Sequence, residues 1–335
     1  MSQILEVECC KKTLIINRRQ NSKSLFRRFA AVVAKPIKYF DRFFRYRHLR
    51  SFISQNFSIS QPLYSSADFN DFIRKHHLKR IVIGSDQVWR EDYCPQIEDY
   101  FLIARPESTM VVGYAISFGG EKFNGCVNKY EEFVQKISAL SFRETQAVNW
   151  HNEFFNPAAI NVLDPALLLS EEHYVSSLGL KIDNKNSRGY AYILDFESWK
   201  ERIINEFSER NLLDFDYFSI SGKKNLSALF DPLSFEGWVN SFFSASYIIT
   251  DSFHGMVLAI KFKKPFLVLA NEKRGVERFT SLLSALALEN RIFYKKSISP
   301  DNNEVEEIDW KLVSRETEKL KNVSLEFLKD ALNDP

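Results

Sequence analysis

From residue 79 onward, short apolar runs rich in β-branched residues alternate with stretches whose apolar residues recur at helical spacing. The apolar runs predict strands at 80–84, 110–116, 138–142, 160–163, 190–196, 215–220, 247–250 and 265–270. The other stretches predict helices at 128–137, 199–210, 235–243, from residue 254, at 276–288 and over most of 305–332. Strands alternating with helices are typical of parallel sheets covered by helices on both faces. The pattern therefore predicts an α/β protein.

A polar stretch at 183–189 interrupts this alternation, which then starts again. We therefore predict two Rossmann-like domains that face each other across a cleft, with the boundary near 170–188. The expected units are a basic, aromatic-rich segment at 1–55, domains at 56–175 and 186–300, and a helical segment at 301–335. Ligands of such sheets bind beyond the carboxyl ends of the strands, so polar residues there are the candidate site residues.

The composition narrows the class of protein. With 45% hydrophobic and 26% charged residues, the chain of 335 residues is neither a disordered protein nor a disulfide scaffold. Apolar runs such as 29–34 and 256–260 are too short to span a bilayer, and the N-terminus has no recognisable secretion signal. The four cysteines lack metal-site spacing. We expect a cytoplasmic protein with reduced thiols, no metal and no cofactor.

Charge is distributed unevenly along the chain. Residues 1–50 hold 13 Lys and Arg but only 3 Asp and Glu, a net charge of +10, so the rest carries −8 of the overall +2. The basic residues of 27–50 alternate with apolar ones at helical spacing, which is typical of a helix on an anionic membrane surface. A core-facing helix with a solvated basic face is the alternative. We expect no nucleic-acid partner, because the remaining chain is acidic and has no recognisable nucleic-acid module.

A first polar cluster follows the strand at 80–84. It combines hydroxyl, carboxylate and amide groups with a flat aromatic ring, a set that can hold a sugar: Ser85, Asp86, Gln87 and Trp89. An ordinary turn is the alternative interpretation, because Ser and Asp also favour helix N-caps.

Two further charged residues follow strands of the first domain. Arg143 opens a helix after the strand at 138–142, where its guanidinium group is well placed to bind a carboxylate or phosphate. The alternative is a surface ion pair with Glu144. The Asp-Pro pair at 164–165 is interpreted as mainly structural.

The strand at 247–250 leads into the strongest candidate site. Asp251 and Ser252 occupy the turn, His254 stands near the start of the next helix, and Gly255 allows close backbone approach. A helix N-terminus attracts anions, and a histidine there can transfer protons near neutral pH.

A cationic loop follows the next strand. Lys273, Arg274 and Arg278 lie at the same expected sheet edge as His254, which favours anion binding over a solvated loop. The chain contains no GxGxxG, Walker or HExxH motif, so dinucleotide, P-loop and zincin interpretations are excluded.

The order GSDQVW, SFRE, VLDPALLL, ITDSFHG and KRGVERF, over residues 79–292, resembles that of the polysaccharide pyruvyl transferase family. The resemblance implies a GT-B-like fold and transfer of pyruvate from phosphoenolpyruvate to two sugar hydroxyls, giving a cyclic ketal on a surface polysaccharide or its lipid-linked precursor. It implies an acceptor-side N-terminal domain and a donor-side C-terminal domain. No metal or cofactor is implied.

The resemblance also assigns roles by position. His254 corresponds to the general acid. The implied donor-binding residues are Arg143, Ser252, Lys273, Arg274 and Arg278, and the implied acceptor-binding residues are Ser85, Asp86, Gln87 and Trp89. A lipid-linked acceptor at the inner face of the cytoplasmic membrane would give the basic segment at 25–54 an anionic surface to bind.

The sequence departs from the family pattern in two places. Many members have Arg-Leu-His where this chain has Ser252-Phe253-His254, and a loop of the type NYGxxLQ near the N-terminus is not found after the strand expected at 13–17. The N-terminal domain is therefore expected to be truncated or altered. Two other functions remain open: a GT-B glycosyltransferase that binds a nucleotide sugar through the loop at 273–278, and a non-catalytic scaffold in glycan assembly.

Overall fold

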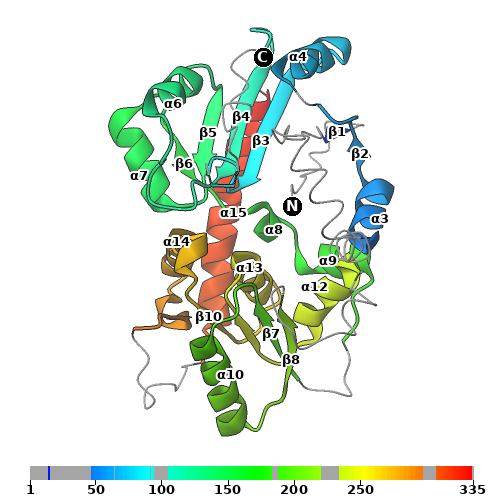
Figure 1. Ribbon diagram of the computed structural model, residues 1–335, viewed down its shortest axis with the longest axis vertical. Coiled ribbons are helices and arrows are strands. Elements are labelled where there is room, and N and C mark those ends of the chain that lie inside the picture. Colours follow the sequence, from blue (N-terminus) through cyan, green and yellow to red (C-terminus); the bar gives the residue numbers. More distant parts are fainter. Residues whose placement is uncertain are drawn as a thin grey trace, which may run out of the picture.

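The computed structural model describes residues 14–15, 47–63, 65–90, 92–93, 105–182, 188–219, 234–296 and 307–333. These residues form two lobes, each built on a parallel sheet (Figure 1). The short strands β1 (Leu14–Ile15) and β2 (Ser58–Ile59) pair separately. The basic stripe is predicted for residues 27–50, and its part from 27 to 46 lies outside the described residues.

The first lobe contains a four-stranded sheet of order β3-β4-β5-β6 with parallel neighbours. Its strands are β3 (Arg80–Asp86), β4 (Met110–Ile116), β5 (Ala139–Phe142) and β6 (Ile160–Asn161), and its helices include α4 (Ser66–Lys75), α6 (Val127–Val134) and α7 (Thr145–Phe154). β4 is buried almost throughout, because it lies inside the sheet and both of its faces are covered. This burial explains its uninterrupted apolar run.

The second lobe contains a five-stranded sheet of order β11-β10-β9-β7-β8, also parallel throughout. Its strands are β7 (Gly189–Ile193), β8 (Phe215–Ser219), β9 (Ile248–Thr250), β10 (Phe266–Leu269) and β11 (Ile292–Phe293). Its helices are α10 (Ser198–Asn211), α12 (Phe235–Ser244), α13 (Phe253–Lys261) and α14 (Glu277–Ala285), with short 3-10 turns at Glu272–Arg274 and Glu289–Arg291.

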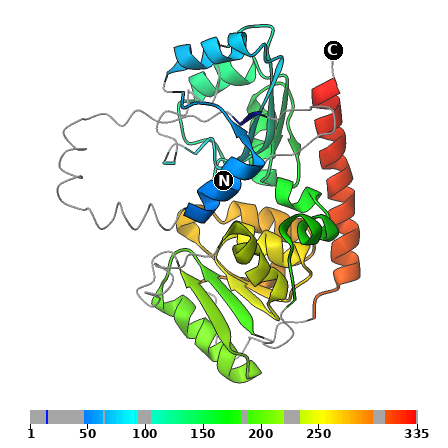
Figure 2. The ribbon, with the colours of Figure 1, turned by 90° about the vertical axis from the view of Figure 1, so that its right-hand side faces the viewer.

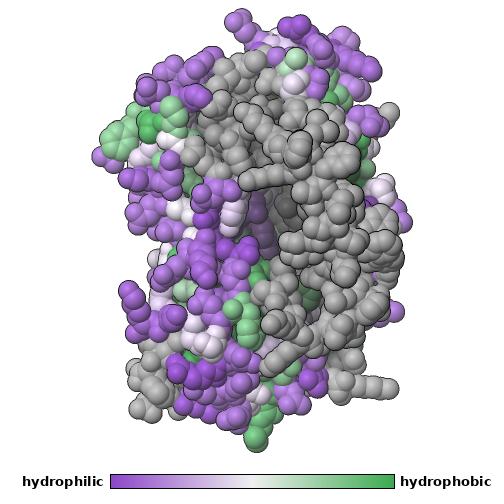
Figure 3. All heavy atoms as spheres, viewed as in Figure 1, coloured by the Kyte–Doolittle hydropathy of each residue, from purple (hydrophilic) through white to green (hydrophobic). Residues whose placement is uncertain are grey.

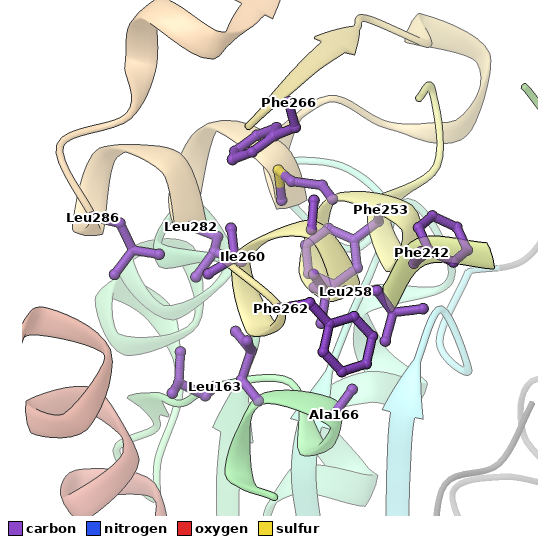
Figure 4. Close-up of a cluster of buried hydrophobic side chains, with 14 of the residues drawn as sticks. Leu163, Ala166, Phe242, Phe253, Leu258, Ile260, Phe262, Phe266, Leu282 and Leu286 are labelled. Atoms are coloured by element: carbon purple, nitrogen blue, oxygen red, sulfur yellow. The ribbon is translucent and has the colours of Figure 1, made fainter. Parts of the chain in front are cut away.

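The hydrophobic core continues from one lobe into the other. Helix α13, which is apolar over most of its surface, packs between the second sheet and α8 (Pro165–Leu168) of the linking segment. Leu163 and Ala166 lie beside Leu258 and Phe262 in this cluster (Figure 4). The start of α13 is therefore fixed by packing against both lobes.

Three helices outside the sheets also contribute to the link between the lobes. Helix α15 (Trp310–Asn333) runs along both of them (Figures 1 and 2), and the hydroxyl of Ser324 accepts a hydrogen bond of 2.9 Å from the backbone N–H of Leu163. Helix α3 (Arg47–Asn56) contacts α12, with the rings of Phe52 and Phe235 4.4 Å apart. Helix α9 (Glu171–Leu178) completes the link to the second lobe.

The predicted fold class is confirmed: the chain is an α/β protein with two Rossmann-like domains in a GT-B-like arrangement. Within the residues described above, no helix is both long and apolar enough to cross a membrane. The same part of the chain has no group of three or more His, Cys, Asp or Glu residues arranged to hold a metal ion.

Candidate active site

Polar side chains from both lobes meet where the carboxyl ends of the two sheets face each other, and the surface is hollowed between the lobes (Figure 3). One of these side chains comes from the end of β3, one from the residue directly after β5, and one from the turn before α8; helices α13 and α14 provide the others. We call this group the seam cluster: Asp86, Arg143, Asp164, His254 and Arg278.

His254 lies in the first turn of α13, directly after β9. The hydroxyl of Ser252 caps this helix by accepting a hydrogen bond from the N–H of Gly255 at 3.3 Å. A Cβ on Gly255 would lie 2.4 Å from Oγ1 of Thr250, so glycine is needed for this close approach. The imidazole is 25% exposed, and its Nε2 lies 3.8 Å from Oδ2 of Asp164. His254 therefore faces the seam beside a carboxylate.

Arg143 and Arg278 come from different lobes and converge on one carboxylate. Nη1 of Arg143 lies 3.4 Å, and Nη1 of Arg278 3.2 Å, from Oδ1 of Asp86. Nη2 of Arg143 also lies 2.9 Å from Oδ2 of Asp164. Both guanidinium groups lie over the ring of Phe253, at 4.9 and 5.3 Å from its centre, and are almost fully buried. Two positive charges are thus held in place close together.

These contacts change how the acidic and basic groups titrate. Burial alone would raise the pKa of Asp86, but Arg143, His254 and Arg278 hold it well below its usual range. Burial lowers the pKa of His254, and the nearby carboxylates of Asp164 and Asp86 oppose this effect only in part. The imidazole is therefore more readily neutral in the ligand-free protein than a histidine in water.

Glu144 is a further buried acid beside the cluster. Its carboxylate accepts a hydrogen bond from the hydroxyl of Ser117. Burial raises the pKa of Glu144 to about 7, although Ser117, Arg143 and Arg278 act in the opposite direction. Oε2 of Glu144, Nε of Arg143 and Nε of Arg278 are buried and have no hydrogen-bond partner among the described residues. Buried polar atoms are normally paired, so these three atoms indicate a place where a polar ligand or water binds.

The loop after β10 connects the lobes. The guanidinium group of Arg274 donates hydrogen bonds to the carboxylate of Asp195. The backbone carbonyl of Arg274 accepts hydrogen bonds from Nε2 of Gln87 at 2.9 Å and from Nη2 of Arg278 at 3.0 Å. Lys273 is exposed and lies 3.6 Å from Glu197. The backbone carbonyl of Arg274 thus joins this loop to Gln87 of the first lobe, whereas its side chain is bonded within the second lobe.

The residues expected to bind the acceptor differ in how exposed they are to solvent. Asp86 is partly open, whereas Ser85 is 4% and Gln87 is 7% exposed. Trp89 is only 1% exposed, and its ring packs edge-on against Phe133 at 5.1 Å, within the core of the first lobe. The expectation that Trp89 presents an open face at the site is therefore corrected: the chain turns its indole inward, into an aromatic cluster.

Two residues contribute to the site in a way that their sequence context does not indicate. Asp164, interpreted as mainly structural, does cap α8 through a hydrogen bond from Ala166 at 2.9 Å, but its second oxygen lies beside Arg143 and His254. Glu144, interpreted as the alternative partner of Arg143, bonds to Ser117 instead. The available signal was position, because Asp164 also follows a strand of the same sheet.

A buried ion pair fixes the turn before His254. Nζ of Lys200 lies 2.6 Å from Oδ2 of Asp251, and both side chains are fully buried. Oδ1 of Asp251 also accepts a hydrogen bond from the N–H of Leu194 at 2.6 Å, and its Oδ2 accepts one from Nδ2 of Asn271 at 3.1 Å. Asp251 therefore joins the ends of β7, β9 and β10 directly behind the site.

Two Rossmann-like domains with paired, buried arginines and a histidine between them define a two-domain α/β protein of GT-B-like class. A family model described as "Polysaccharide pyruvyl transferase" matches residues 13–273. The chain belongs to the polysaccharide pyruvyl transferase family, so it is placed among transferases of polysaccharide synthesis.

Solved structures give more distant likenesses. A Listeria monocytogenes protein, provisionally described as a UDP-N-acetylglucosamine 2-epimerase, is 12% identical, with a TM-score of 0.45 over 97% of this chain and 98% of its own. The UDP-GlcNAc 2-epimerase of Methanocaldococcus jannaschii is 10% identical, with a TM-score of 0.40 over 92% of each chain. A comparison with curated proteins finds no match.

Proposed function

We propose that this protein transfers pyruvate from phosphoenolpyruvate to two hydroxyls of a sugar, forming a cyclic ketal. The observation that carries the proposal is the meeting of two buried guanidinium groups with a partly exposed imidazole at the seam. Phosphoenolpyruvate is a small molecule with a phosphate and a carboxylate. Two adjacent arginines are a suitable receptor for such a pair of anionic groups.

The reaction needs one proton at carbon and stabilisation of the leaving phosphate. A proton from the imidazolium of His254 adds to the methylene carbon, and the oxygen of one sugar hydroxyl bonds to the central carbon. The C–O bond to phosphate then breaks, and the second hydroxyl closes the ring. The protons of the two hydroxyls replace the proton of His254 and neutralise the departing phosphate, so the cycle balances.

Each member of the seam cluster has a task in this scheme. Arg143 and Arg278 hold the donor and stabilise charge on the phosphate as it leaves. Asp164 orients the imidazole of His254 and favours its protonated form. Asp86, which lies between the two guanidinium groups, is the counter-ion that the donor's own negative charge would replace.

The test measures phosphate release from phosphoenolpyruvate with and without a lipid-linked sugar acceptor. We expect release to require the acceptor and to fall at least ~100-fold in His254→Asn, the loss typical of a missing general acid. The same preparation is also tested for a melting shift with phosphoenolpyruvate and with a nucleotide sugar.

Stabilisation by the nucleotide sugar alone would refute the proposal in favour of a glycosyltransferase. A well-folded protein that binds neither donor, and is inactive on a proper acceptor, would instead support a scaffold role. Full activity of His254→Asn would remove His254 from the mechanism.

A further inference from the structure

The sugar acceptor needs a place at the seam, and the strand end after β3 provides little room for it. Ser85, Gln87 and Trp89 are each less than a tenth exposed. The amide of Gln87 is already bonded to the carbonyl of Arg274. A sugar bound near the donor must therefore contact other side chains.

A cavity of about 660 Å³ lies at the seam, between the start of α7 in the first lobe and α14 with β11 in the second. This volume is in the range of small-molecule sites. Figure 1 shows α7 and α14 next to each other on the same side of the molecule. The lining residues are Thr145, Gln146, Thr280, Ser281, Leu283, Ser284, Ala285, Glu289, Ile292 and Tyr294.

The lining has the chemistry of a site for a sugar. The hydroxyls of Thr280 and Ser284 donate to the carbonyl of Glu277 and the carboxylate of Glu289, and their oxygens keep an acceptor position for a sugar hydroxyl. The side chains of Leu283 and Ile292 can pack against the C–H face of a ring. Oε1 of Gln146 is buried and has no hydrogen-bond partner within the described part of the chain, so it has an acceptor position for a sugar hydroxyl. The lining contains no Lys or Arg, which disfavours the diphosphate of a nucleotide.

The cavity adjoins the arginine pair through two of its lining residues. The N–H of Thr145 donates to Oγ of Ser281 at 3.0 Å across the seam. Thr145 directly follows Glu144 in the chain, and Ser281 lies one helical turn after Arg278. A ligand that contacts Thr145 therefore lies beside the neighbour of Glu144 in the chain. One that contacts Ser281 lies one helical turn from Arg278 of the candidate donor site.

We propose that this seam cavity binds the acceptor as an uncharged hexopyranose unit of a glycan, with its hydroxyls directed to Gln146 and the α14 hydroxyls. This inference rests on the proposed function, because it assigns the second substrate of that reaction. The open side of the cavity, where Ser284, Ala285 and Glu289 are exposed, leaves room for the rest of the glycan chain.

The test uses saturation-transfer NMR with a panel of methyl hexopyranosides at millimolar concentration. Ala285→Trp places an indole in the cavity without touching the seam cluster. Glu153→Trp is the matched control, because Glu153 is exposed on α7 and does not line the cavity. Gln146→Ala tests the amide separately, should the tryptophan perturb folding. Melting with phosphoenolpyruvate is measured for every variant.

We expect at least one hexopyranoside to bind the wild-type protein, to lose about tenfold or more in affinity in Ala285→Trp and Gln146→Ala, and to be unaffected by Glu153→Trp. Sugar binding that persists in both cavity variants would overturn the proposal, as would no binding by any member of the panel. The melting shift is expected to be the same in all variants. If phosphoenolpyruvate fails to bind the wild-type protein while a sugar still binds in the cavity, the proposed donor is wrong and the acceptor site stands.

Discussion

Replacing Glu144 by glutamine tests whether a buried, titrating carboxyl stands beside the two arginines. Glu144 has no exposed surface, it accepts a hydrogen bond from Ser117, and its second oxygen is unpaired among the described residues. Burial raises its pKa to about 7, compared with an ordinary value of 4.5. Glutamine has nearly the same shape, keeps an oxygen for Ser117, and cannot ionise.

The sign of the effect follows from proton linkage. Because the pKa of Glu144 is higher in the folded than in the unfolded protein, its contribution to stability is complete below pH 4.5 and is lost as the pH rises to about 7. One pKa unit corresponds to about 1.4 kcal/mol, so the loss amounts to roughly 3 kcal/mol. Glu144→Gln should therefore gain about that much free energy of unfolding, relative to wild type, between pH 4.5 and pH 8.

The assay is urea unfolding of both proteins at several pH values, with Glu153→Gln as control. Glu153 lies on the same helix, α7, and is exposed, so its substitution should change the free energy of unfolding by the same small amount at every pH. A difference between Glu144→Gln and wild type that stays constant from pH 4.5 to pH 8 would show that Glu144 does not titrate in this range, and the reasoning would fail.

Three further predictions concern other parts of the site. Asp164→Asn keeps the cap of α8 but removes the negative charge beside His254. The rate of phosphate release should therefore fall about 10- to 100-fold, and the pH optimum of that rate should move to lower pH. An unchanged pH profile would contradict this. Arg278→Gln should raise the KM for phosphoenolpyruvate about tenfold or more. The side chain of Arg274 bonds Asp195, so Arg274→Gln should change this KM less than about threefold. Equal effects of the two substitutions would exclude this division of roles. Removal of residues 25–46 should abolish salt-dependent co-sedimentation with anionic vesicles, and binding that persists would exclude this segment as the membrane contact.

The sequence predicts the two sheets and the edge at which the site lies, because parallel strands have a recognisable pattern and their carboxyl ends share one edge. That rule alone was enough to group Asp86, Arg143 and His254. It cannot give the direction of a side chain after a turn. Asp86 has a φ of 76°, and the chain beyond it carries Trp89 into the core and not to the surface.

The sequence pattern also could not predict hydrogen bonds and ion pairs between residues that are distant in the sequence. Arg274 and Asp195 are separated by 79 positions, yet their side chains are hydrogen-bonded to each other. Tertiary contacts decide which groups already surround a charged side chain, and the local spacing of residues in the sequence does not show these contacts. The same holds for Asp164, whose capping role is local while its contacts with Arg143 and His254 are not.

The charges of the seam cluster imply that donor and proton bind together. Its two guanidinium groups are already balanced by the carboxylates of Asp86 and Asp164, and burial favours a neutral His254. Phosphoenolpyruvate adds negative charge, which must raise the pKa of His254 and draw a proton to it. Titration calorimetry at pH 7.5 in two buffers of different ionisation enthalpy should therefore reveal uptake of about one proton, reduced in His254→Asn. Equal binding enthalpies in the two buffers would show that no proton is taken up when the donor binds, and the coupling of donor and proton would be refuted.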